Sequence, residues 1–285
     1  MSELPSEGNK GGVTHRVVHA RRTHVSQALS HEHIQVGRAT LNVTRCGTGE
    51  TVVLLPSWAR GAADFVDLMG VLAAAGYHAI AVNPRGIGGS TGPLTGLTLH
   101  DFAADVAGLL ETLNAAPAHI VGHGAGNRIA RCLAADRPDL VKTVILLAAG
   151  GRVAPSPDTS AALARTLTAD LSEMEWVAAM RTAGFFAPST DPLVWRHGWW
   201  PAVAAAHLAA SHATPPATWW AAGTAPLLVM QGLEDRLAPP ANGRALREAC
   251  GERVQLLELP DAGHALLPEQ PEAIAQAMLA FLRAH

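Results

Sequence analysis

Cysteine is scarce in this sequence of 285 residues, and the three that occur, Cys46, Cys132 and Cys250, are widely separated. An odd number of cysteines without close pairs makes neither a disulfide framework nor a zinc cluster. The five histidines between residues 15 and 33 have no regular metal-ligand spacing either. We therefore expect no metal or other cofactor, and this cysteine usage favours a reducing cytoplasm.

Excess charge and long apolar runs are also lacking. The 21 basic side chains are balanced by 24 acidic ones, so we expect no positive surface for nucleic acid or an anionic membrane. No segment has the roughly eighteen consecutive apolar residues of a transmembrane helix, and the N-terminal segment lacks the apolar centre of a signal peptide. The expected ligand is therefore a small molecule, and a homo-oligomer is compatible with the sequence.

What the chain has is apolar residues, at 48% of the total, which is enough for one large core. From about residue 33, short β-branched runs alternate with longer helical stretches, a pattern typical of βα units that build a mostly parallel sheet. Strands are expected at residues 34–36, 40–44, 52–55, 78–82, 119–121, 143–147, 226–230 and 254–257. Helices are expected around residues 65–72, 100–113, 125–135, 241–249 and 271–282.

This alternation stops between residues 152 and 222, a segment rich in alanine and tryptophan with a mostly helical pattern. We expect it to form a helical cap inserted into a core made of residues 33–151 and 223–285. In open α/β sheets ligands bind at the carboxyl ends of the strands, so the cap should cover that edge. The polar residues 1–32 are expected to form an N-terminal arm.

A glycine-rich turn joins a predicted strand to a predicted helix in residues 120–127, which read IVGHGAGN. This is the setting of the G-x-S-x-G nucleophile elbow, in which the central residue has a strained backbone. The flanking glycines let the strand and the helix approach closely. Gly124 stands at the centre, so the elbow has no side chain that could form an acyl or ester intermediate.

An acid and a histidine follow in later segments of the chain. Asp235 comes directly after a predicted strand in the segment VMQGLED, and His264 comes after the next strand in LPDAGH. An imidazole needs an acceptor on one ring nitrogen to fix its tautomer and to stabilise its protonated form. Asp235 can supply that acceptor to His264.

With the elbow, the acid and the histidine in this order, the chain from about residue 33 resembles the α/β-hydrolase superfamily of esterases, lactonases and epoxide hydrolases. The resemblance implies an α/β fold with a mostly parallel, eight-stranded sheet, flanking helices and a helical cap. It also implies a catalytic triad whose serine is replaced by Gly124. The oxyanion hole would consist of the backbone N–H groups of Trp58 and Ala125, although Pro56 and Ser57 stand where many relatives have His-Gly.

Six of the seven tryptophans lie in the predicted cap, and the seventh is Trp58. A cap of about seventy residues has little core of its own, so some of these rings are expected to line a pocket. The residues expected to contact the substrate are Trp58, Trp176, Phe185, Phe186, Trp195, Trp199, Trp200, Trp219 and Trp220. They predict an apolar or aromatic substrate, whereas His197, His207 and His212 are expected on the rim or surface of the cap.

The missing serine leaves three hypotheses. In the first, the protein is an enzyme in which His264 and Asp235 act as a general base on water or substrate, and the space left by the serine holds the water. Such a base contributes typically about 10²–10⁴-fold and suits an activated ester, a lactone, or a non-hydrolytic elimination, rearrangement or cyclisation. In the second, the chain is a serine esterase whose nucleophile has been replaced by Gly124. In the third, it is a binding protein without catalysis, although retention of both Asp235 and His264 argues against this.

Overall fold

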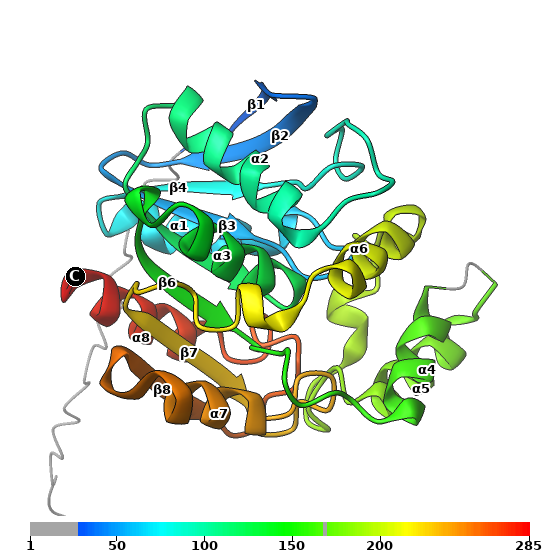
Figure 1. Ribbon diagram of the computed structural model, residues 1–285. Helices are drawn as coiled ribbons and strands as arrows, with labels where there is room; N and C mark the ends of the chain where they lie inside the picture. Colours follow the sequence, from blue (N-terminus) through cyan, green and yellow to red (C-terminus); the bar gives the residue numbers. More distant parts are fainter. Residues whose placement is uncertain (1–27, 168–169) are drawn as a thin grey trace, which may run out of the picture.

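Eight strands form one sheet in the computed structural model, which describes residues 28–167 and 170–285 (Figure 1). The strands are β1 (Ser30–Val36), β2 (Ala39–Cys46), β3 (Glu50–Leu55), β4 (Tyr77–Val82), β5 (Ala118–His123), β6 (Val141–Leu147), β7 (Leu227–Gly232) and β8 (Val254–Leu259). The α-helices are α1 (Val66–Ala74), α2 (Leu99–Thr112), α3 (Ala125–Asp136), α4 (Pro157–Thr166), α5 (Glu173–Ala183), α6 (Pro201–Ala213), α7 (Ala241–Cys250) and α8 (Pro271–Arg283). Short 3-10 helices are η1 (Ala62–Phe65), η2 (Pro138–Leu140), η3 (Pro192–Trp195), η4 (Pro216–Thr218) and η5 (Gly251–Arg253).

The strand order is β1-β2-β4-β3-β5-β6-β7-β8. β2 runs antiparallel to both β1 and β4, and the remaining neighbours are parallel. The predicted fold class, a mostly parallel eight-stranded sheet between helices, is confirmed. All parallel strands therefore end at the same edge of the sheet, where β3, β5, β7 and β8 deliver the loops that carry the predicted site residues.

The N-terminal boundary differs from the prediction. Residues 1–27 of the predicted arm lie outside the described residues, whereas residues 30–32 belong to β1. β1 is the edge strand of the sheet and most of its side chains are exposed, so its polar first half carries no apolar signal. The apolar pattern that we used begins only at Ile34.

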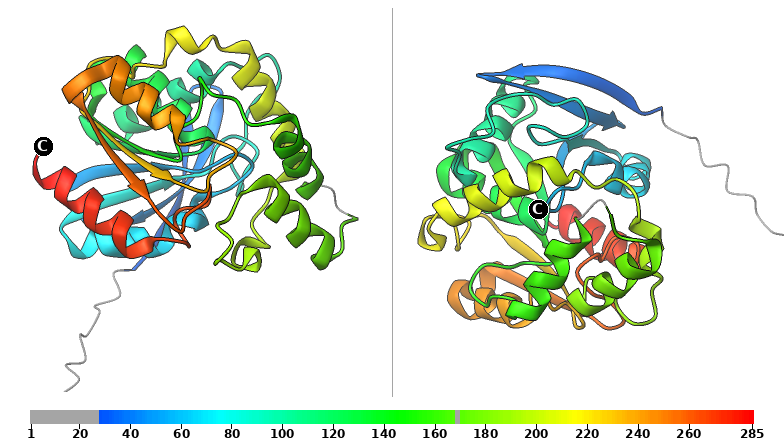
Figure 2. Two further views of the ribbon diagram at one scale, coloured as in Figure 1. Left: turned by 90° about the horizontal axis from the view of Figure 1, so that it is seen from below. Right: turned by 90° about the vertical axis from the view of Figure 1, so that its right-hand side faces the viewer.

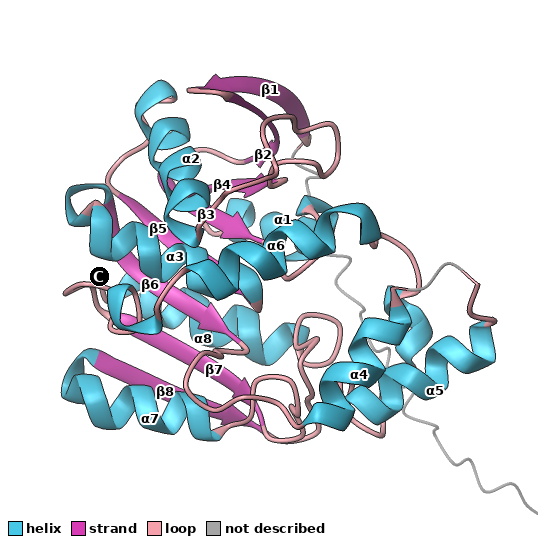
Figure 3. Ribbon diagram, turned by 45° about the vertical axis from the view of Figure 1, so that its right-hand side comes forward, coloured by secondary structure: helices cyan, strands magenta, loops and turns pink. Residues whose placement is uncertain are grey.

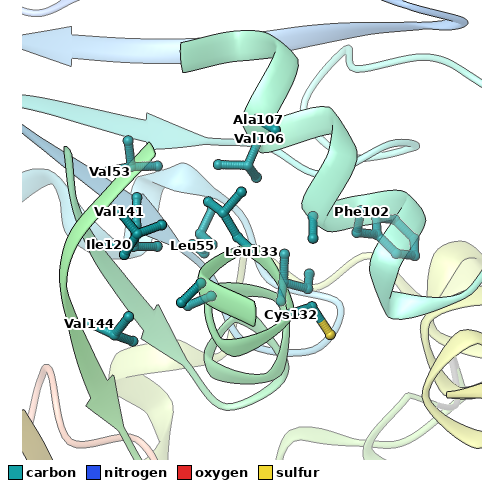
Figure 4. Packing of buried hydrophobic residues seen from close by; sticks show 14 of the residues in the cluster. Val53, Leu55, Phe102, Val106, Ala107, Ile120, Cys132, Leu133, Val141 and Val144 are labelled. Carbon is teal, nitrogen blue, oxygen red and sulfur yellow. The ribbon is translucent and has the colours of Figure 1, made fainter. Parts of the chain in front are cut away.

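Helices cover both faces of the sheet, as the two views of Figure 2 show. α2, α3 and α7 pack on one face, while α1 and α8 pack on the other. Figure 4 shows part of the first face, where Val53 and Ile120 of the sheet lie close to Leu133 of α3 and Val106 of α2. Because the central strands are buried on both sides, they read in the sequence as continuous apolar runs.

The segment predicted as a cap contains α4, α5 and α6, which lie beyond the carboxyl ends of the parallel strands (Figure 3). Two of these helices begin with side-chain caps: Ser156 accepts from the backbone of Thr159, and Ser172 forms a capping box with Glu175. α6 is fastened to the core by the Trp58 indole N–H, which donates to the Ala204 carbonyl over 2.8 Å. In the part of the chain that the structure describes, no helix is long and apolar enough to cross a membrane.

His207 of α6 is buried, which corrects the expectation that it lies on the surface of the cap; His197 and His212 are exposed. Its ring meets the Phe102 ring edge-on, with the ring centroids 5.3 Å apart, and its Nε2 atom has no hydrogen-bond partner among the described residues. Burial lowers the pKa of His207 from the ordinary value of 6.5 to about 4, because the charged ring would lose its hydration. The ring is therefore an uncharged part of the contact between α6 and α2.

This burial predicts a pH-dependent stability. Between the lowered pKa and the ordinary one, the unfolded chain binds a proton at His207 that the folded chain does not, so the free energy of unfolding falls as the pH falls below 6.5. His207→Leu should remove this contribution, about 2 kcal/mol at about pH 5. Urea denaturation of both proteins at about pH 7.5 and about pH 5 measures it, with His212→Leu as the exposed control. Equal pH dependence in wild type and His207→Leu would contradict the assignment.

Candidate active site

Gly124 lies at the sharp turn between β5 and α3, with φ 53° and ψ −111°. This is the left-handed, strained backbone expected at the centre of a nucleophile elbow. The flanking glycines are required sterically: a Cβ atom on Gly122 would overlap the backbone of Asn127, and one on Gly126 would overlap the carbonyl of Leu55. The elbow is therefore fully formed around a residue without a side chain.

Asp235 follows β7, His264 follows β8, and the two side chains are joined by a hydrogen bond of 2.9 Å between His264 Nδ1 and Asp235 Oδ2. Both residues are buried. The second carboxylate oxygen of Asp235 accepts from the backbone N–H groups of Leu237 and Ala238, each at 2.8 Å. The carboxylate is thus fixed as the acceptor for the imidazole, and Nε2 of His264 is turned toward Gly124.

The loop of His264 is held by the cap as well as by the core. The carbonyl of Phe185 accepts from the backbone N–H groups of His264, at 2.8 Å, and Ala265, at 3.0 Å. The carboxylate of Glu269 accepts from the backbone of Gly263 and Leu266 in the histidine loop, and from Ala187 in the cap, and its burial raises its pKa. The position of His264 therefore depends on the loop that follows α5.

His123, the residue before the elbow glycine, is fully buried behind His264. Its Nε2–H group donates to the carbonyl of His264 over 2.7 Å. Burial, helped by repulsion from His264, lowers the pKa of His123 to about 3, so its ring stays neutral near neutral pH. His123 therefore supports the backbone of His264 and does not exchange protons with a ligand.

The side chain of Ser57, in the loop after β3, lies beside Gly124 and close to His264. A Cβ atom on Gly124 would overlap the Ser57 hydroxyl oxygen and would lie 3.1 Å from Ser57 Cβ and 3.0 Å from His264 Nε2. Ser57 therefore fills the volume that an elbow side chain would take, and the expected gap for water or a ligand is the cavity that Gly124 and His264 line. The sequence signal for Ser57 was the departure from His-Gly at positions 56 and 57.

A cavity of about 270 Å³ opens in front of Ser57, Gly124 and His264. Its walls are mainly apolar and come from both the core and the cap; they include Leu163, Leu208, Leu237, Trp58, Phe185 and Trp199. The two predicted oxyanion-hole residues, Trp58 and Ala125, line it. Neither of their backbone N–H groups donates to an acceptor within residues 28–167 and 170–285, so both are available to a ligand.

Six of the nine residues expected to contact the substrate do not line this cavity. They are Trp176, Phe186, Trp195, Trp200, Trp219 and Trp220. All except Trp200, which is exposed, are buried in the packing of the cap and its junction with the core. Several of these indoles instead stack against arginines, with Arg60 4.5 Å from the Trp195 ring centroid and Arg131 4.4 Å from that of Trp219. The cap thus has more core of its own than its length suggested.

Arg128, one turn into α3 from the elbow, also lines the cavity and was missed by the sequence analysis. No carboxylate pairs with it among the described residues, and its guanidinium carbon lies 5.9 Å from the centroid of the Trp219 ring. Partial burial lowers the pKa of Arg128. Arg131, the next arginine of α3, is fully buried and does not line the cavity, so the positive charge of this wall comes from Arg128.

A larger hollow of about 520 Å³ lies between β1 and α2, away from His264 and Asp235. Two of its arginines pair with carboxylates: Arg137 binds Glu111, and Arg85 binds the Asp105 carboxylate through two hydrogen bonds of 2.6 and 2.7 Å. Arg85 thus ties the loop after β4 to α2. The lining of this hollow has no histidine, serine, threonine or cysteine, so the cavity beside His264 is the candidate active site.

Comparisons with known proteins agree with this fold. Residues 50–271 match a family model described as the alpha/beta hydrolase fold. A Mycobacterium tuberculosis protein provisionally named non-heme bromoperoxidase BpoC is 30% identical over 268 residues, covering 82% of this chain and 94% of that protein. Among solved structures, BpoC superposes with a TM-score of 0.72 at 28% identity, covering 90% of this chain and 99% of that one. The structure of an E-2-(acetamidomethylene)succinate hydrolase superposes with a TM-score of 0.71 at 25% identity, covering 90% of this chain and 100% of that one.

The competition for space between positions 57 and 124 predicts a coupling in stability. Gly124→Ala should lower the free energy of unfolding by about 1–3 kcal/mol, because the added methyl group meets the Ser57 side chain. The cost should be smaller in a Ser57→Gly background, where that side chain is absent. A double-mutant cycle in urea gives the coupling, and single effects that add within about 0.5 kcal/mol would show that the two positions do not compete.

Proposed function

The chain belongs to the α/β-hydrolase family, as its sequence predicted, and from that premise we propose that it is a hydrolase-like enzyme in which His264 and Asp235 form a general base. Its substrate is a small, mainly apolar molecule with an acyl group, such as an ester or a lactone. One observation carries the proposal: Nδ1 of His264 is bound to Asp235 while Nε2 is directed into an apolar cavity. A base held in this way contributes typically about 10²–10⁴-fold to a reaction rate.

The chemistry follows from this arrangement. Nε2 of His264 takes the proton from the hydroxyl group that attacks the acyl carbon of the substrate. Asp235 stabilises the imidazolium that forms. The backbone N–H groups of Trp58 and Ala125 are free to bind the oxygen on which negative charge develops. Ala125 is also the first residue of α3, so the helix dipole adds to that stabilisation. Free oxyanion donors favour acyl transfer over a non-hydrolytic elimination or rearrangement.

The two competing hypotheses are less well supported. A serine at position 124 would place its Cβ atom against the Ser57 side chain, so the surroundings are packed for glycine, which argues against a trapped serine esterase. A non-catalytic binding protein has no need for a histidine with both a carboxylate partner and a fixed backbone. Here the His264 main chain is bonded to Phe185 and His123.

The unpaired Arg128 refines the substrate class. A guanidinium without a carboxylate partner in an apolar cavity favours a ligand that supplies the negative charge. We therefore propose a substrate with an apolar body and an anionic group, most simply a carboxylate. A relative whose name specifies a succinate derivative as its substrate is consistent with this chemistry.

Removing the base tests the proposed function. His264→Ala should lower kcat/KM on the best substrate from a panel of aryl esters and lactones by at least about 10²-fold, since general-base assistance is lost. Asp235→Asn should also lower it, because the amide no longer stabilises the imidazolium. His197→Ala, the same change at an exposed position of the cap, is the matched control. Unchanged turnover in His264→Ala would refute the general-base assignment.

Arg128→Gln tests the anionic group. For esters that carry a carboxylate, KM should rise by roughly 10-fold or more, which corresponds to losing a charged hydrogen bond. KM for neutral esters of the same size should change little. Arg244→Gln, which removes an exposed arginine far along the chain, serves as the control. An equal change in KM for charged and neutral esters would contradict the role.

A further inference from the structure

We propose that Ser57 is the nucleophile of this enzyme, so that the reactive hydroxyl stands on the loop after β3 and not on the elbow. The inference rests on the proposed function, because it needs His264 as the base. It adds a covalent acyl-enzyme intermediate at Ser57. Because Gly124 at the elbow has no side chain, it leaves room for the Ser57 hydroxyl from the neighbouring loop.

The geometry of the pair carries the proposal. The position that a Cβ atom on Gly124 would take overlaps the Ser57 hydroxyl oxygen and lies 3.0 Å from Nε2 of His264, so the hydroxyl and the imidazole are neighbours on either side of this position. Ser57, Gly124 and His264 all line the same cavity. The hydroxyl is therefore presented both to the base and to any ligand in the cavity. Many relatives have His-Gly in this loop, with glycine at the position of Ser57 and the nucleophile at the position of Gly124. In this chain the glycine and the hydroxyl-bearing residue are exchanged.

The Ser57 hydroxyl is also free to react. It makes no hydrogen bond to another residue of the described part of the chain, although the residue is only 3% exposed. Ser90, which is equally buried, shows the usual alternative: its hydroxyl accepts from the Asn42 backbone and donates to the carbonyl of Asn83. A buried hydroxyl without a partner, facing a cavity, is available to a base and a substrate.

The loop that carries Ser57 is held rigidly. The carbonyl of Ser57 accepts from the backbone N–H of Arg60 over 3.1 Å. The buried guanidinium of Arg60 pairs with Asp64 and lies 4.5 and 4.7 Å from the ring centroids of Trp195 and Trp199. A nucleophile must be held close to its productive position, and these contacts supply that constraint.

The reaction balances without any further component. Ser57 Oγ bonds to the acyl carbon while its proton passes to Nε2 of His264, and the bond between the acyl carbon and the leaving oxygen breaks. The leaving alcohol takes the proton back from His264. A water molecule then attacks the acyl carbon with His264 again as base, which releases the acid and restores the Ser57 hydroxyl. The net change is ester plus water to acid plus alcohol.

The test is covalent labelling with an alkyl fluorophosphonate, followed by peptide mapping by mass spectrometry. Oγ of the nucleophile bonds to phosphorus, fluoride leaves, and the hydroxyl proton passes to His264, so the probe marks the nucleophile without a known substrate. Wild type should be labelled at Ser57, and Ser57→Ala should be unlabelled. His264→Ala should be labelled at least about 10²-fold more slowly. Acid quenching during turnover of an aryl ester should trap the acyl group on the same peptide.

The exchanged variant Ser57→Gly/Gly124→Ser is the positive control for the site. It returns the hydroxyl to the elbow and removes the side chain that would collide with it, so the label should move to residue 124. Ser57→Ala should lower kcat/KM by at least about 10³-fold while its thermal unfolding matches that of wild type. Ser57→Cys should keep a reactive group and remain open to acylation.

The outcomes separate this inference from the proposed function. If His264→Ala abolishes turnover but Ser57→Ala does not, the general base stands and the Ser57 nucleophile is overturned. If turnover needs Ser57 but neither label nor trapped acyl group is found on its peptide, the covalent role is again overturned, because the hydroxyl then only orients water or substrate. If turnover survives both substitutions, both proposals fail.

Discussion

The site depends on one steric constraint: the Ser57 side chain occupies volume that any side chain at position 124 would also need. A Cβ atom at position 124 would overlap the Ser57 hydroxyl, so a side chain at the centre of the elbow would require Ser57 to move. Around this position stand the imidazole with its carboxylate partner at 2.9 Å and the N–H groups of Trp58 and Ala125, which have no acceptor among the described residues. An elbow without a side chain is therefore surrounded by groups that can serve a nucleophile.

The second requirement is that the imidazole be fixed from all sides, and the cap and the core share this task. Asp235 holds one ring nitrogen, the neutral His123 holds the carbonyl of His264, and Phe185 from the cap holds its N–H group. The low pKa of His123, about 3, matters here because a charged ring beside His264 would oppose formation of the imidazolium during the reaction. Burial thus keeps one histidine uncharged so that its neighbour can gain a proton.

The sequence predicted those features that depend on neighbours along the chain. The apolar run of β3 and the glycine-rich turn after β5 are local patterns, and they gave the fold class and the elbow. Asp235 and His264 were found because each stands in the loop after a strand, in the order elbow, acid and histidine. The features that the sequence did not predict depend on contacts through space. The start of β1 was missed because most of its side chains are exposed. Six aromatic residues were wrongly expected in the cavity, whereas they pack in the cap or lie on its surface. Ser57 drew notice only as a departure from a pattern, and no local signal marks Arg128 as an unpaired cation.

The carboxylate of Glu269 has a consequence for how molecules reach and leave the cavity. It ties Ala187 of the cap to Gly263 and Leu266 around His264, and its burial means that separating these segments would leave backbone N–H groups without their acceptor. An outward movement of the loop after α5 would therefore break the hydrogen bonds that position His264 just when a ligand enters the cavity. The cavity is also lined by Ser160 and Leu163 of α4 and by Leu208 and Ser211 of α6. A ligand that enters between these two helices leaves the hydrogen bonds around His264 intact.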